Sequence, residues 1–314
     1  MPRYRNELPQ LTGNLFLTDG GLETTLVFHE GIDLPEFAAF VLLENEDGRE
    51  ILRNYYRKYA NIAREHTVGF ILESMTWRAS EDWGRKLGYT SEQIADFNRK
   101  SITLLQDIRS EFDSDLPYLV ISGCIGPRGD AYSPDISMTV DEAQAFHRTQ
   151  IATFGETEAD MVAAFTIPNI SEGIGIALAA SAENMPVVIS FTVETDGRLP
   201  SGELLKNAIE QVDAATGNTP VYFMVNCAHP THFIDLLRGE PWTKRIRAVR
   251  ANASTKSHAE LDSATELDEG NPVELSAQYK DLVGTLENLN VLGGCCGTDH
   301  RHIEEICRMN LSQA

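Results

Sequence analysis

Three of the five cysteines in the sequence lie in two short motifs that can supply ligands to a metal ion. Cys227 follows the apolar run VYFMVN, whereas Cys295 and Cys296 are neighbours in VLGGCCGTDH. A disulfide between neighbouring cysteines needs a strained ring, and buried cysteines can also pack simply as small hydrophobic residues. Three thiolates that leave one open position are typical of catalytic zinc, and such soft ligands favour Zn²⁺ over Mg²⁺ or Ca²⁺. We therefore predict a zinc site formed by Cys227, Cys295 and Cys296.

The elements that would position these cysteines are visible as short apolar, β-branched runs that alternate with longer stretches of helical periodicity. We predict eight strands, at 15–18, 69–74, 118–123, 161–165, 187–191, 221–226, 246–251 and 290–294. The predicted helices span 46–66, 90–112, 139–155, 171–183, 201–215, 230–238, 272–287 and 299–310. TSEQ and TVDE, at the start of the second and third helices, are N-terminal capping patterns.

Eight alternating units in 314 residues predict an α/β fold, a (β/α)₈ TIM barrel that forms a single domain over residues 1–314. A doubly wound open sheet is the structural alternative. The stretch after the first strand, TDGGLETTL, lacks both the G-x-G-x-x-G pattern and the P-loop spacing. The pattern therefore favours the barrel.

In a TIM barrel the chemistry lies at the carboxyl ends of the strands, and the uncommon residues of this sequence fall at those ends. Besides the three cysteines, the candidate site residues are Asp19, Gly20, Gly21, Glu73, Ser74, Trp77, Arg78 and Asn226. Two further cysteines are predicted to pack as small hydrophobic residues. Cys124 lies among tight turns in SGCIGP, and Cys307 lies beside isoleucines in the last predicted helix.

Charge and hydropathy exclude several classes of partner. The sequence has 26 basic and 47 acidic side chains, a net charge of −21, which argues against binding to nucleic acid or an anionic membrane. The chain contains no apolar run of about 20 residues, and its first residues lack the apolar core of a signal peptide. We therefore expect a cytoplasmic protein with reduced thiols that acts on small molecules.

These motifs resemble those of the zinc-dependent homocysteine S-methyltransferases, the family of the betaine–homocysteine and S-methylmethionine–homocysteine enzymes. The resemblance covers nearly the whole chain and rests on FLTDGGLETTL, ISGCIGPRGDAY, PVVISFTVETDGRLPSG, FMVNCAHP and VLGGCCGTDHRHI. It implies the barrel fold and assigns the zinc of the family to Cys227, Cys295 and Cys296. It also implies transfer of a methyl group from a sulfonium or quaternary ammonium donor to a thiol, with homocysteine giving methionine as the default.

The resemblance also implies roles for the neighbouring residues. Asp19 would hold the amino group of the substrate, and the backbone amides of Gly20 and Gly21 would approach its carboxylate. Asn226 would form a hydrogen bond near the metal. Trp77 would form one wall for an onium donor by cation–π contact, unless it only packs beneath a loop. A cation at Arg78 would repel such a donor or, alternatively, hold a carboxylate.

One position departs from the family pattern. Phe165, in MVAAFTIPN, stands where family members have a glutamate that contacts the substrate amino group. Loss of such a charge-assisted contact costs about 1.5–3 kcal/mol, or one to two decades in affinity. Glu73, at the end of the second predicted strand, would be a compensating carboxylate.

Two alternatives to homocysteine methylation therefore stay open. The first is a barrel that binds zinc or another ligand without methyl transfer, and the second is a zinc-thiolate enzyme with another acceptor thiol. The sequence shows no module for folate or cobalamin after the last predicted helix, so we do not expect either cofactor. It predicts neither the identity of the methyl donor nor the oligomeric state.

Overall fold

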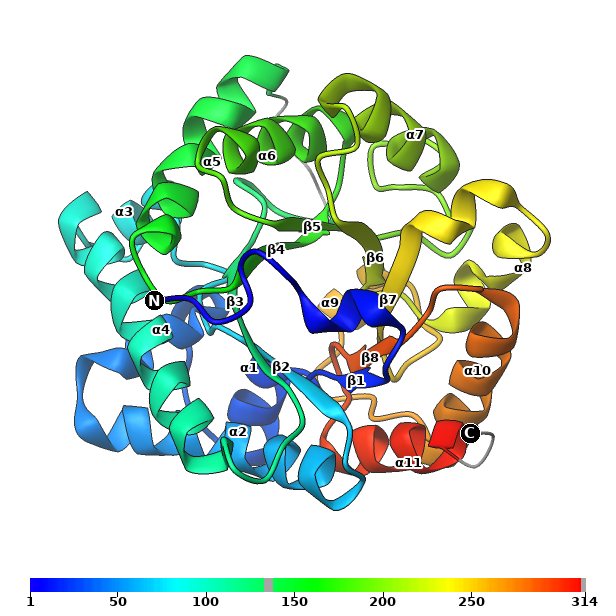
Figure 1. Ribbon diagram of the computed structural model, residues 1–314, viewed down its shortest axis with the longest axis horizontal. Coiled ribbons are helices and arrows are strands. Elements are labelled where there is room, and N and C mark those ends of the chain that lie inside the picture. Colours follow the sequence, from blue (N-terminus) through cyan, green and yellow to red (C-terminus); the bar gives the residue numbers. More distant parts are fainter. Residues whose placement is uncertain (133–137, 312–314) are drawn as a thin grey trace.

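The computed structural model describes residues 1–132 and 138–311 and contains a closed barrel of eight parallel strands in sequence order (Figure 1). β1 pairs with both β2 and β8, which closes the sheet and rules out the open doubly wound alternative. The strands are β1 (Phe16–Leu17), β2 (Gly69–Glu73), β3 (Leu119–Ile125), β4 (Met161–Ile167), β5 (Val187–Phe191), β6 (Tyr222–Asn226), β7 (Ile246–Ala251) and β8 (Val291–Gly294). The predicted TIM barrel is confirmed.

The strands form because their apolar side chains can be buried on both faces of the sheet. Inside the barrel, side chains such as Phe16, Val120 and Met224 form one cluster. The alternate residues, such as Leu17, Ile121 and Val225, point outward and pack beneath the helices. The barrel interior is therefore filled, and a ligand can enter only beyond the ends of the strands.

The outer layer consists of helices that cover the strands. They are α2 (Glu46–Glu65), α4 (Ser91–Phe112), α5 (Val140–Gly155), α6 (Ile170–Ala182), α7 (Leu205–Thr216), α8 (Ile234–Leu237), α10 (Pro272–Thr285) and α11 (His300–Leu311). Both expected capping patterns are present, since Thr90 and Thr139 each form a complete capping box with the residue three positions later. The sequence therefore predicts most of this layer to within one or two residues.

Two predicted helices differ from the structure. α7 begins four residues later than expected, at Leu205, because the preceding residues form turns and a short bridge between Arg198 and Leu204. The helix predicted over 230–238 is divided into a 3₁₀ turn, Pro230–His232, and α8. Phe233 separates the two with a non-helical φ of −138°.

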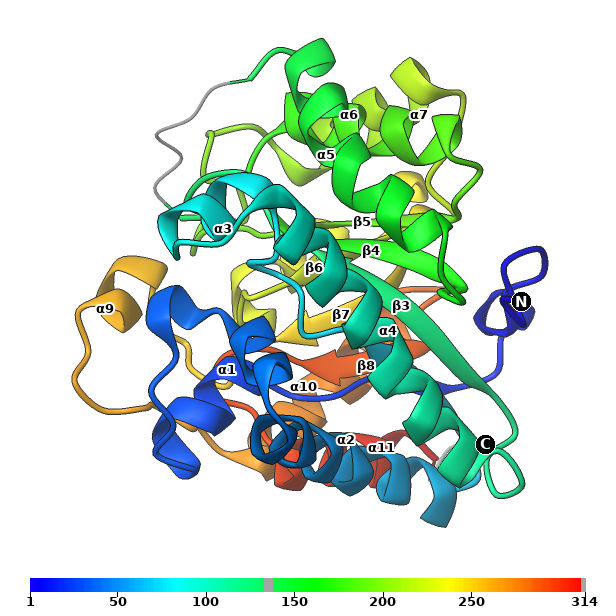
Figure 2. The same cartoon turned by 90° about the vertical axis from the view of Figure 1, so that its left-hand side faces the viewer.

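Three short helices lie in loops at the carboxyl end of the barrel, and the sequence did not predict them. They are α1 (Leu22–Thr24) after β1, α3 (Glu81–Lys86) after β2 and α9 (His258–Asp262) after β7. Figure 2 shows α1, α3 and α9 on one side of the molecule and the N-terminus on the other. These loops therefore surround the end of the barrel that carries the candidate residues.

The opposite end of the barrel is closed by the N-terminal segment. Leu8 belongs to the interior cluster, and the Gln10 carbonyl accepts hydrogen bonds from Asn290 and Arg247. Arg5 donates to three backbone carbonyls, those of residues 155, 157 and 159. This end has a structural role, because it seals the core from solvent.

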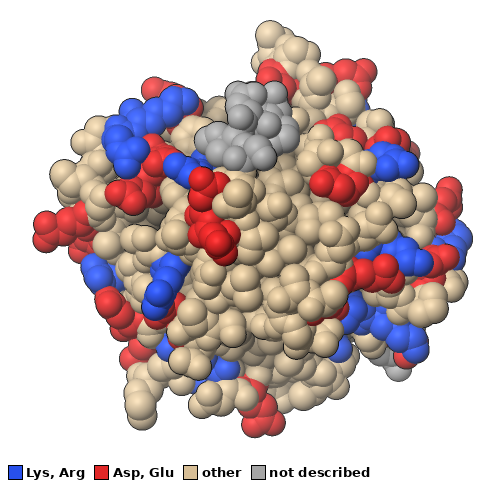
Figure 3. All heavy atoms as spheres, turned by 90° about the horizontal axis from the view of Figure 1, so that it is seen from above, with Lys and Arg blue, Asp and Glu red and all other residues tan. Residues whose placement is uncertain are grey.

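Charge is mixed at the surface despite the net charge of −21. On the face drawn in Figure 3, acidic and basic side chains are interspersed and do not separate into patches of one sign. Within the described ranges, no helix is both long and apolar enough to cross a membrane.

Candidate active site

The three predicted metal ligands meet at the carboxyl end of the barrel. Cys227 follows β6, and Cys295 and Cys296 follow β8; their sulfur atoms all lie within 4.8 Å of one another. The Sγ atoms of Cys227 and Cys296 are 3.8 Å apart. Two sulfurs bound to one tetrahedral zinc, each at about 2.3 Å, would be separated by ~3.8 Å. The cluster can therefore accept a tetrahedral metal ion.

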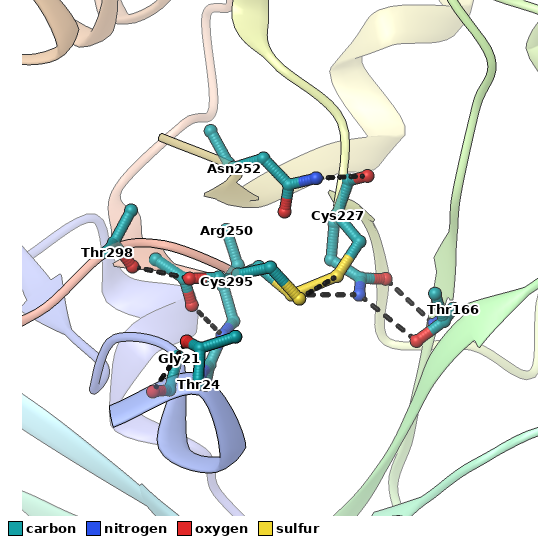
Figure 4. Close-up of a disulfide and its surroundings, with 12 residues drawn as sticks. Gly21, Thr24, Thr166, Cys227, Arg250, Asn252, Cys295 and Thr298 are labelled. Carbon is teal, nitrogen blue, oxygen red and sulfur yellow. Dashed lines mark hydrogen bonds between the residues drawn. A yellow bond between two sulfur atoms is a disulfide. The ribbon is translucent and has the colours of Figure 1, made fainter. Parts of the chain in front are cut away.

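In this structure Cys227 and Cys295 are joined in a disulfide (Figure 4). The sequence argued against a bond between the neighbours Cys295 and Cys296, and the structure has none there; it did not anticipate this longer-range pairing. A sulfur in a disulfide is not a thiolate, so the bond must be reduced before all three cysteines can bind a metal. Cys296 keeps a free thiol beside the disulfide.

The backbone at Cys227 is held in an unusual conformation. Its φ is +55°, a left-handed value that is uncommon for a residue other than glycine. Its amide donates to the Arg250 carbonyl at 3.0 Å. Its own carbonyl accepts from Asn252 Nδ2 at 3.0 Å (Figure 4) and from His258 Nε2 at 2.5 Å. These contacts with β7 and the loop after it hold the turn that directs the thiol of Cys227 toward the other two.

The loop that carries Cys295 and Cys296 is packed against the loop after β1. A Cβ added at Gly21 would lie 2.6 Å from the Cys295 carbonyl oxygen, so only glycine permits this approach. The Gly21 amide donates to the Thr298 carbonyl at 3.0 Å. This amide is therefore not available to a substrate carboxylate, contrary to the expectation from the resemblance. Gly21 instead brings the two loops together.

Most of the predicted site residues line one cavity, here called the inner pocket, of about 630 Å³ including its opening to solvent. Arg78 does not line it. The inner pocket is formed by residues 19–24, Glu73, Ser74, Trp77, Cys124, Tyr132, Phe165, Thr166, Asn226, Cys227, Arg250, Cys295 and Cys296. The cysteine cluster therefore opens onto a pocket with both acidic and aromatic walls.

An arginine that the sequence analysis missed lies in the inner pocket. Arg250, on β7, forms a buried ion pair with Asp19 at 2.8 Å, and it also donates to the carbonyls of Gly294 and Gly20. Asp19 accepts a further hydrogen bond from the Tyr55 hydroxyl at 2.9 Å. The charge of Asp19 is thus already balanced within the protein. An arginine in the buried strand IRAVRA was the signal that could have revealed this pair, because a buried charge requires a partner.

A second buried carboxyl group in the inner pocket, that of Glu73, has one oxygen without a hydrogen-bond partner among the described residues. Glu73 is 5% exposed, and the oxygen concerned is Oε2. Burial raises the pKa of the Glu73 carboxyl to about 7, although Arg250 opposes this shift. Phe165 also faces this space, with its ring centroid 5.0 Å from the Arg250 guanidinium carbon. Glu73 and Glu23, which also lines the inner pocket and whose pKa burial likewise raises to about 7, are therefore the acidic groups available to a ligand.

Two other predicted residues form hydrogen bonds within the site. Asn226 Nδ2 donates to Cys295 Sγ at 3.9 Å (Figure 4), and Asn226 Oδ1 accepts from the Thr166 amide at 2.8 Å. The expected contact between Asn226 and the metal-site cysteines is thus present. The Ser74 hydroxyl accepts from the Cys124 amide at 2.8 Å and contacts the Thr76 hydroxyl, so it links β2 to β3.

Trp77 and Arg78 lie at the boundary of a second, larger cavity, here called the outer groove. It is lined by residues of the loops after β1, β2, β3, β7 and β8, including Phe28, Phe37, Arg78, Trp83, Arg128, His258 and Leu261. The Arg78 guanidinium carbon is 4.0 Å from the Trp77 ring centroid. One face of this indole is therefore covered by Arg78 and is closed to an onium donor. Trp77 and Cys296 line both cavities.

The free cysteines behave differently from one another. Cys124 and Cys307 are buried, as the packing interpretation expects. Burial raises the pKa of the Cys296 thiol to about 12. A thiolate at this position consequently needs a nearby cation, and a metal ion bound by the cluster would supply it.

Comparison with known proteins identifies the family of this chain. A family model described as homocysteine S-methyltransferase matches residues 16–309. A selenocysteine Se-methyltransferase from Brassica oleracea var. italica is 26% identical, over 98% of this chain and 92% of the relative. Homocysteine S-methyltransferase 1 from Arabidopsis thaliana is 24% identical, over 96% and 95%.

The fold also matches a solved structure. The crystal structure of the homocysteine methyltransferase MmuM from Escherichia coli, in its metallated form, superposes with a TM-score of 0.72. The two are 21% identical, and the match covers 94% of this chain and 96% of MmuM. At that identity the likeness supports the barrel fold, whereas the family model covers nearly the whole sequence. The chain belongs to the homocysteine S-methyltransferase family.

Proposed function

We propose that the protein transfers a methyl group from a sulfonium or quaternary ammonium donor to homocysteine, giving methionine, with Zn²⁺ held by Cys227, Cys295 and Cys296. The convergence of these three sulfurs at the mouth of the inner pocket carries the proposal. Family membership and the names of the relatives, which act on homocysteine or selenocysteine, support it. A reducing compartment such as the cytoplasm would keep the three thiols available.

When bound, Zn²⁺ would hold the acceptor thiol as a thiolate near neutral pH, with its fourth coordination position left open by the three cysteines. The protein itself positions the reactants. Asn226 orients Cys295, and the contacts of Asn252 and His258 hold the turn at Cys227. In-line displacement at a methyl carbon depends on such positioning, because sulfur, methyl carbon and leaving atom must be collinear.

We assign recognition of the homocysteine ammonium group to Glu73. Phe165 removes the acid that the family uses, and Asp19 is engaged by Arg250 and Tyr55. Glu73 retains an unpartnered oxygen in the inner pocket. A bound ammonium group would favour the ionised form of this carboxyl group and satisfy that oxygen.

The test compares wild-type protein with a Cys295→Ser, Cys296→Ser double variant, both purified under reducing conditions. We expect about one zinc per chain in the wild type and methionine formation from homocysteine with at least one sulfonium or ammonium donor. The double variant should lose both. Cys307→Ala, which changes a buried cysteine away from the site, is the matched control and should retain zinc. Equal and negligible zinc in all three proteins would contradict the proposal.

A second candidate function is methyl transfer to a different thiol or selenol. Phe165 favours it, because the wall that should attract an ammonium group is aromatic and lies beside Arg250. The experiment is a panel of acceptors with and without an α-amino group, assayed with wild type and Phe165→Glu. If a des-amino thiol is preferred by the wild type and homocysteine by Phe165→Glu, homocysteine is not the natural acceptor.

The remaining alternative is a zinc-binding protein that no longer transfers methyl groups. It predicts stoichiometric zinc, lost in the double variant, without turnover across the donor and acceptor panels. Transfer to any thiol at a rate well above the zinc-free background excludes this alternative.

A further inference from the structure

Arg78 is a buried cation that feels the charges of Asp130 and Glu23 but forms no salt bridge with a described residue. The residue is 9% exposed, and it makes no ion pair within 4 Å with any described residue. Its Nη1 atom donates one long hydrogen bond, 3.4 Å, to the Gly129 carbonyl. Its Nε atom has no hydrogen-bond partner among the described residues. Burying an unpaired charge lowers stability, unless a ligand supplies the opposite charge and the missing hydrogen-bond acceptors.

Two indole rings hold the Arg78 guanidinium in place. Its central carbon lies 4.0 Å from the Trp77 ring centroid and 3.7 Å from the Trp83 ring centroid, so the guanidinium contacts both rings. Trp77 packs closely against the backbone of Gly126, because a Cβ added at Gly126 would lie 2.2 Å from the Trp77 carbonyl oxygen. Within the described part of the chain, neither indole Nε1 atom has a hydrogen-bond acceptor. The cluster therefore presents fixed and unsatisfied N–H donors.

The two other Lys and Arg side chains that line the outer groove are already paired. Lys86 pairs with Glu36 at 2.9 Å, and Arg128 pairs with Asp82 at 2.7 Å, all four of them in the outer groove. Arg78 is thus set apart from the other two cations of this groove by its lack of a salt bridge to a described residue. An incoming anion would be attracted to Arg78 first, since the other two are neutralised.

The outer groove joins the inner pocket where a methyl donor must approach. The two cavities share Glu23, Thr24, Trp77, Tyr132 and Cys296. A donor that lies in the outer groove can bring its onium methyl group toward the cysteine cluster while its other end remains beside Arg78. A donor that is only a cation would gain nothing from Arg78 and would be repelled by it.

We propose that Arg78 binds an acidic group of the methyl donor and thereby selects an onium compound that carries a carboxylate over one that is a simple cation. This inference rests on the proposed methyl transfer and assigns the donor end of that reaction to the outer groove. Arg78, Trp77 and Trp83 form the carboxylate site, and Arg78 is its specificity-determining residue. The planar guanidinium suits a carboxylate, because it can offer two parallel N–H donors.

Binding can be measured without any chemistry by tryptophan fluorescence, because two of the three tryptophans flank Arg78. The reduced, zinc-loaded protein is titrated, without acceptor, with 3-(dimethylsulfonio)propanoate and with its methyl ester, which keeps the sulfonium and removes the negative charge. We expect the wild type to bind the acid about 10- to 100-fold more tightly than the ester, as for one charge-assisted contact. Arg78→Gln should bind the two within about twofold of each other, and Arg78→Lys should recover part of the preference.

Arg128→Gln is the matched control, since it removes a cation of the same groove that already has a partner. It should leave the preference for the acid unchanged. Equal binding of acid and ester by the wild type, or a preference that survives Arg78→Gln, overturns the proposal.

Kinetics separate the donor carboxylate from the acceptor carboxylate. We expect Arg78→Gln to raise the KM of the acid donor and to leave unchanged the KM ratio of homocysteine to homocysteine amide. A change in the acceptor ratio alone would place the acceptor carboxylate at Arg78 and contradict the assignment. Absence of methionine with every donor, combined with an intact binding preference, would reject the proposed function and retain the anion site.

Discussion

The inner pocket and the outer groove, although they share a wall, are built in opposite ways. The polar groups at the base of the inner pocket are engaged by other protein groups, as in the Asp19–Arg250 pair and the hydrogen bonds of Asn226. In the outer groove, by contrast, Arg78 and its two flanking indoles keep donors that have no partner among the described residues. The difference indicates a preorganised centre for the reacting sulfur beside a recognition surface that is completed only by its ligand.

Glu73 is an exception within the inner pocket, because it is buried there without an ion pair to a described residue. The Oε2 atom of Glu73, like the Nε atom of Arg78, has no hydrogen-bond partner among the described residues, but the two groups carry opposite charges when ionised. An amino-acid acceptor and an acidic donor would thus be recognised at separate carboxylate and guanidinium groups. Four substitutions test this division, and they are described in order of decreasing expected effect.

Breaking the Asp19–Arg250 pair should have the largest effect, because both partners are buried, at 3% and 8% exposure. We expect Arg250→Met to lower the free energy of unfolding by about 3–5 kcal/mol, since it leaves the Asp19 carboxylate uncompensated. Urea denaturation measures this change. Asp19→Asn combined with Arg250→Met should recover much of the loss, whereas Lys100→Met, in an exposed pair with Asp96, should have little effect. Equal losses in the single and double variants would show that the pair is not what stabilises this end of the barrel.

Gly21→Ala should disturb the cysteine loop directly. The new methyl group would lie 2.4 Å from Thr24 Oγ1 and 2.6 Å from the Cys295 carbonyl oxygen, so the two loops must separate. We expect a loss of about 1–3 kcal/mol of stability together with reduced zinc content. Gly155→Ala is the control, because nothing lies within 4 Å of its Cβ position. Unchanged zinc content in Gly21→Ala would mean that the loop contact does not position Cys295.

Glu73→Gln should lower kcat/KM for homocysteine about tenfold, because one charge-assisted contact with the acceptor is lost. The pKa of the Glu73 carboxyl is raised to about 7 by burial, so in the free enzyme it becomes protonated as the pH falls below that value. The preference for homocysteine over its des-amino analogue, 4-sulfanylbutanoate, should therefore decrease between pH 8 and pH 6. Taking the ratio of the two acceptors removes the common effect of thiol ionisation.

The same ratio should be independent of pH in Glu73→Gln, since the amide does not titrate. Asp19 and Arg250, the other charged groups that face Glu73, form an ion pair with each other. A wild-type ratio that does not change with pH would reject the assignment of the ammonium group to Glu73.

Trp83→Phe should have the smallest effect, confined to the outer groove. It removes one indole that contacts Arg78, a cation–π contact worth about 0.5–1 kcal/mol, and should raise the KM of an acidic donor roughly two- to fivefold. The KM of homocysteine should not change. Trp242→Phe, at the opposite end of the barrel before β7, is the control for loss of a tryptophan. An equal rise in both KM values would indicate a general disturbance of the site.

The amino-acid sequence by itself determined the barrel and the convergence of three cysteines at its rim. Strand ends are recognisable because buried parallel strands are short apolar runs, and Cys227, Cys295 and Cys296 follow two of those runs directly. In a closed barrel all such ends meet at one rim, so their proximity follows from the topology. The capping boxes at Thr90 and Thr139 were predictable for a similar reason, since they depend only on residues close in sequence.

The tertiary structure alone decided which polar groups are paired and which remain free. Arg250 and Asp19 are separated by more than two hundred residues, and no local sequence pattern predicts their ion pair. The contact of Arg78 with two indoles requires both the turn after β2 and the unpredicted α3, which carries Trp83. Pairing and burial are properties of distances between side chains in space, and residue types and spacing along the chain do not specify those distances.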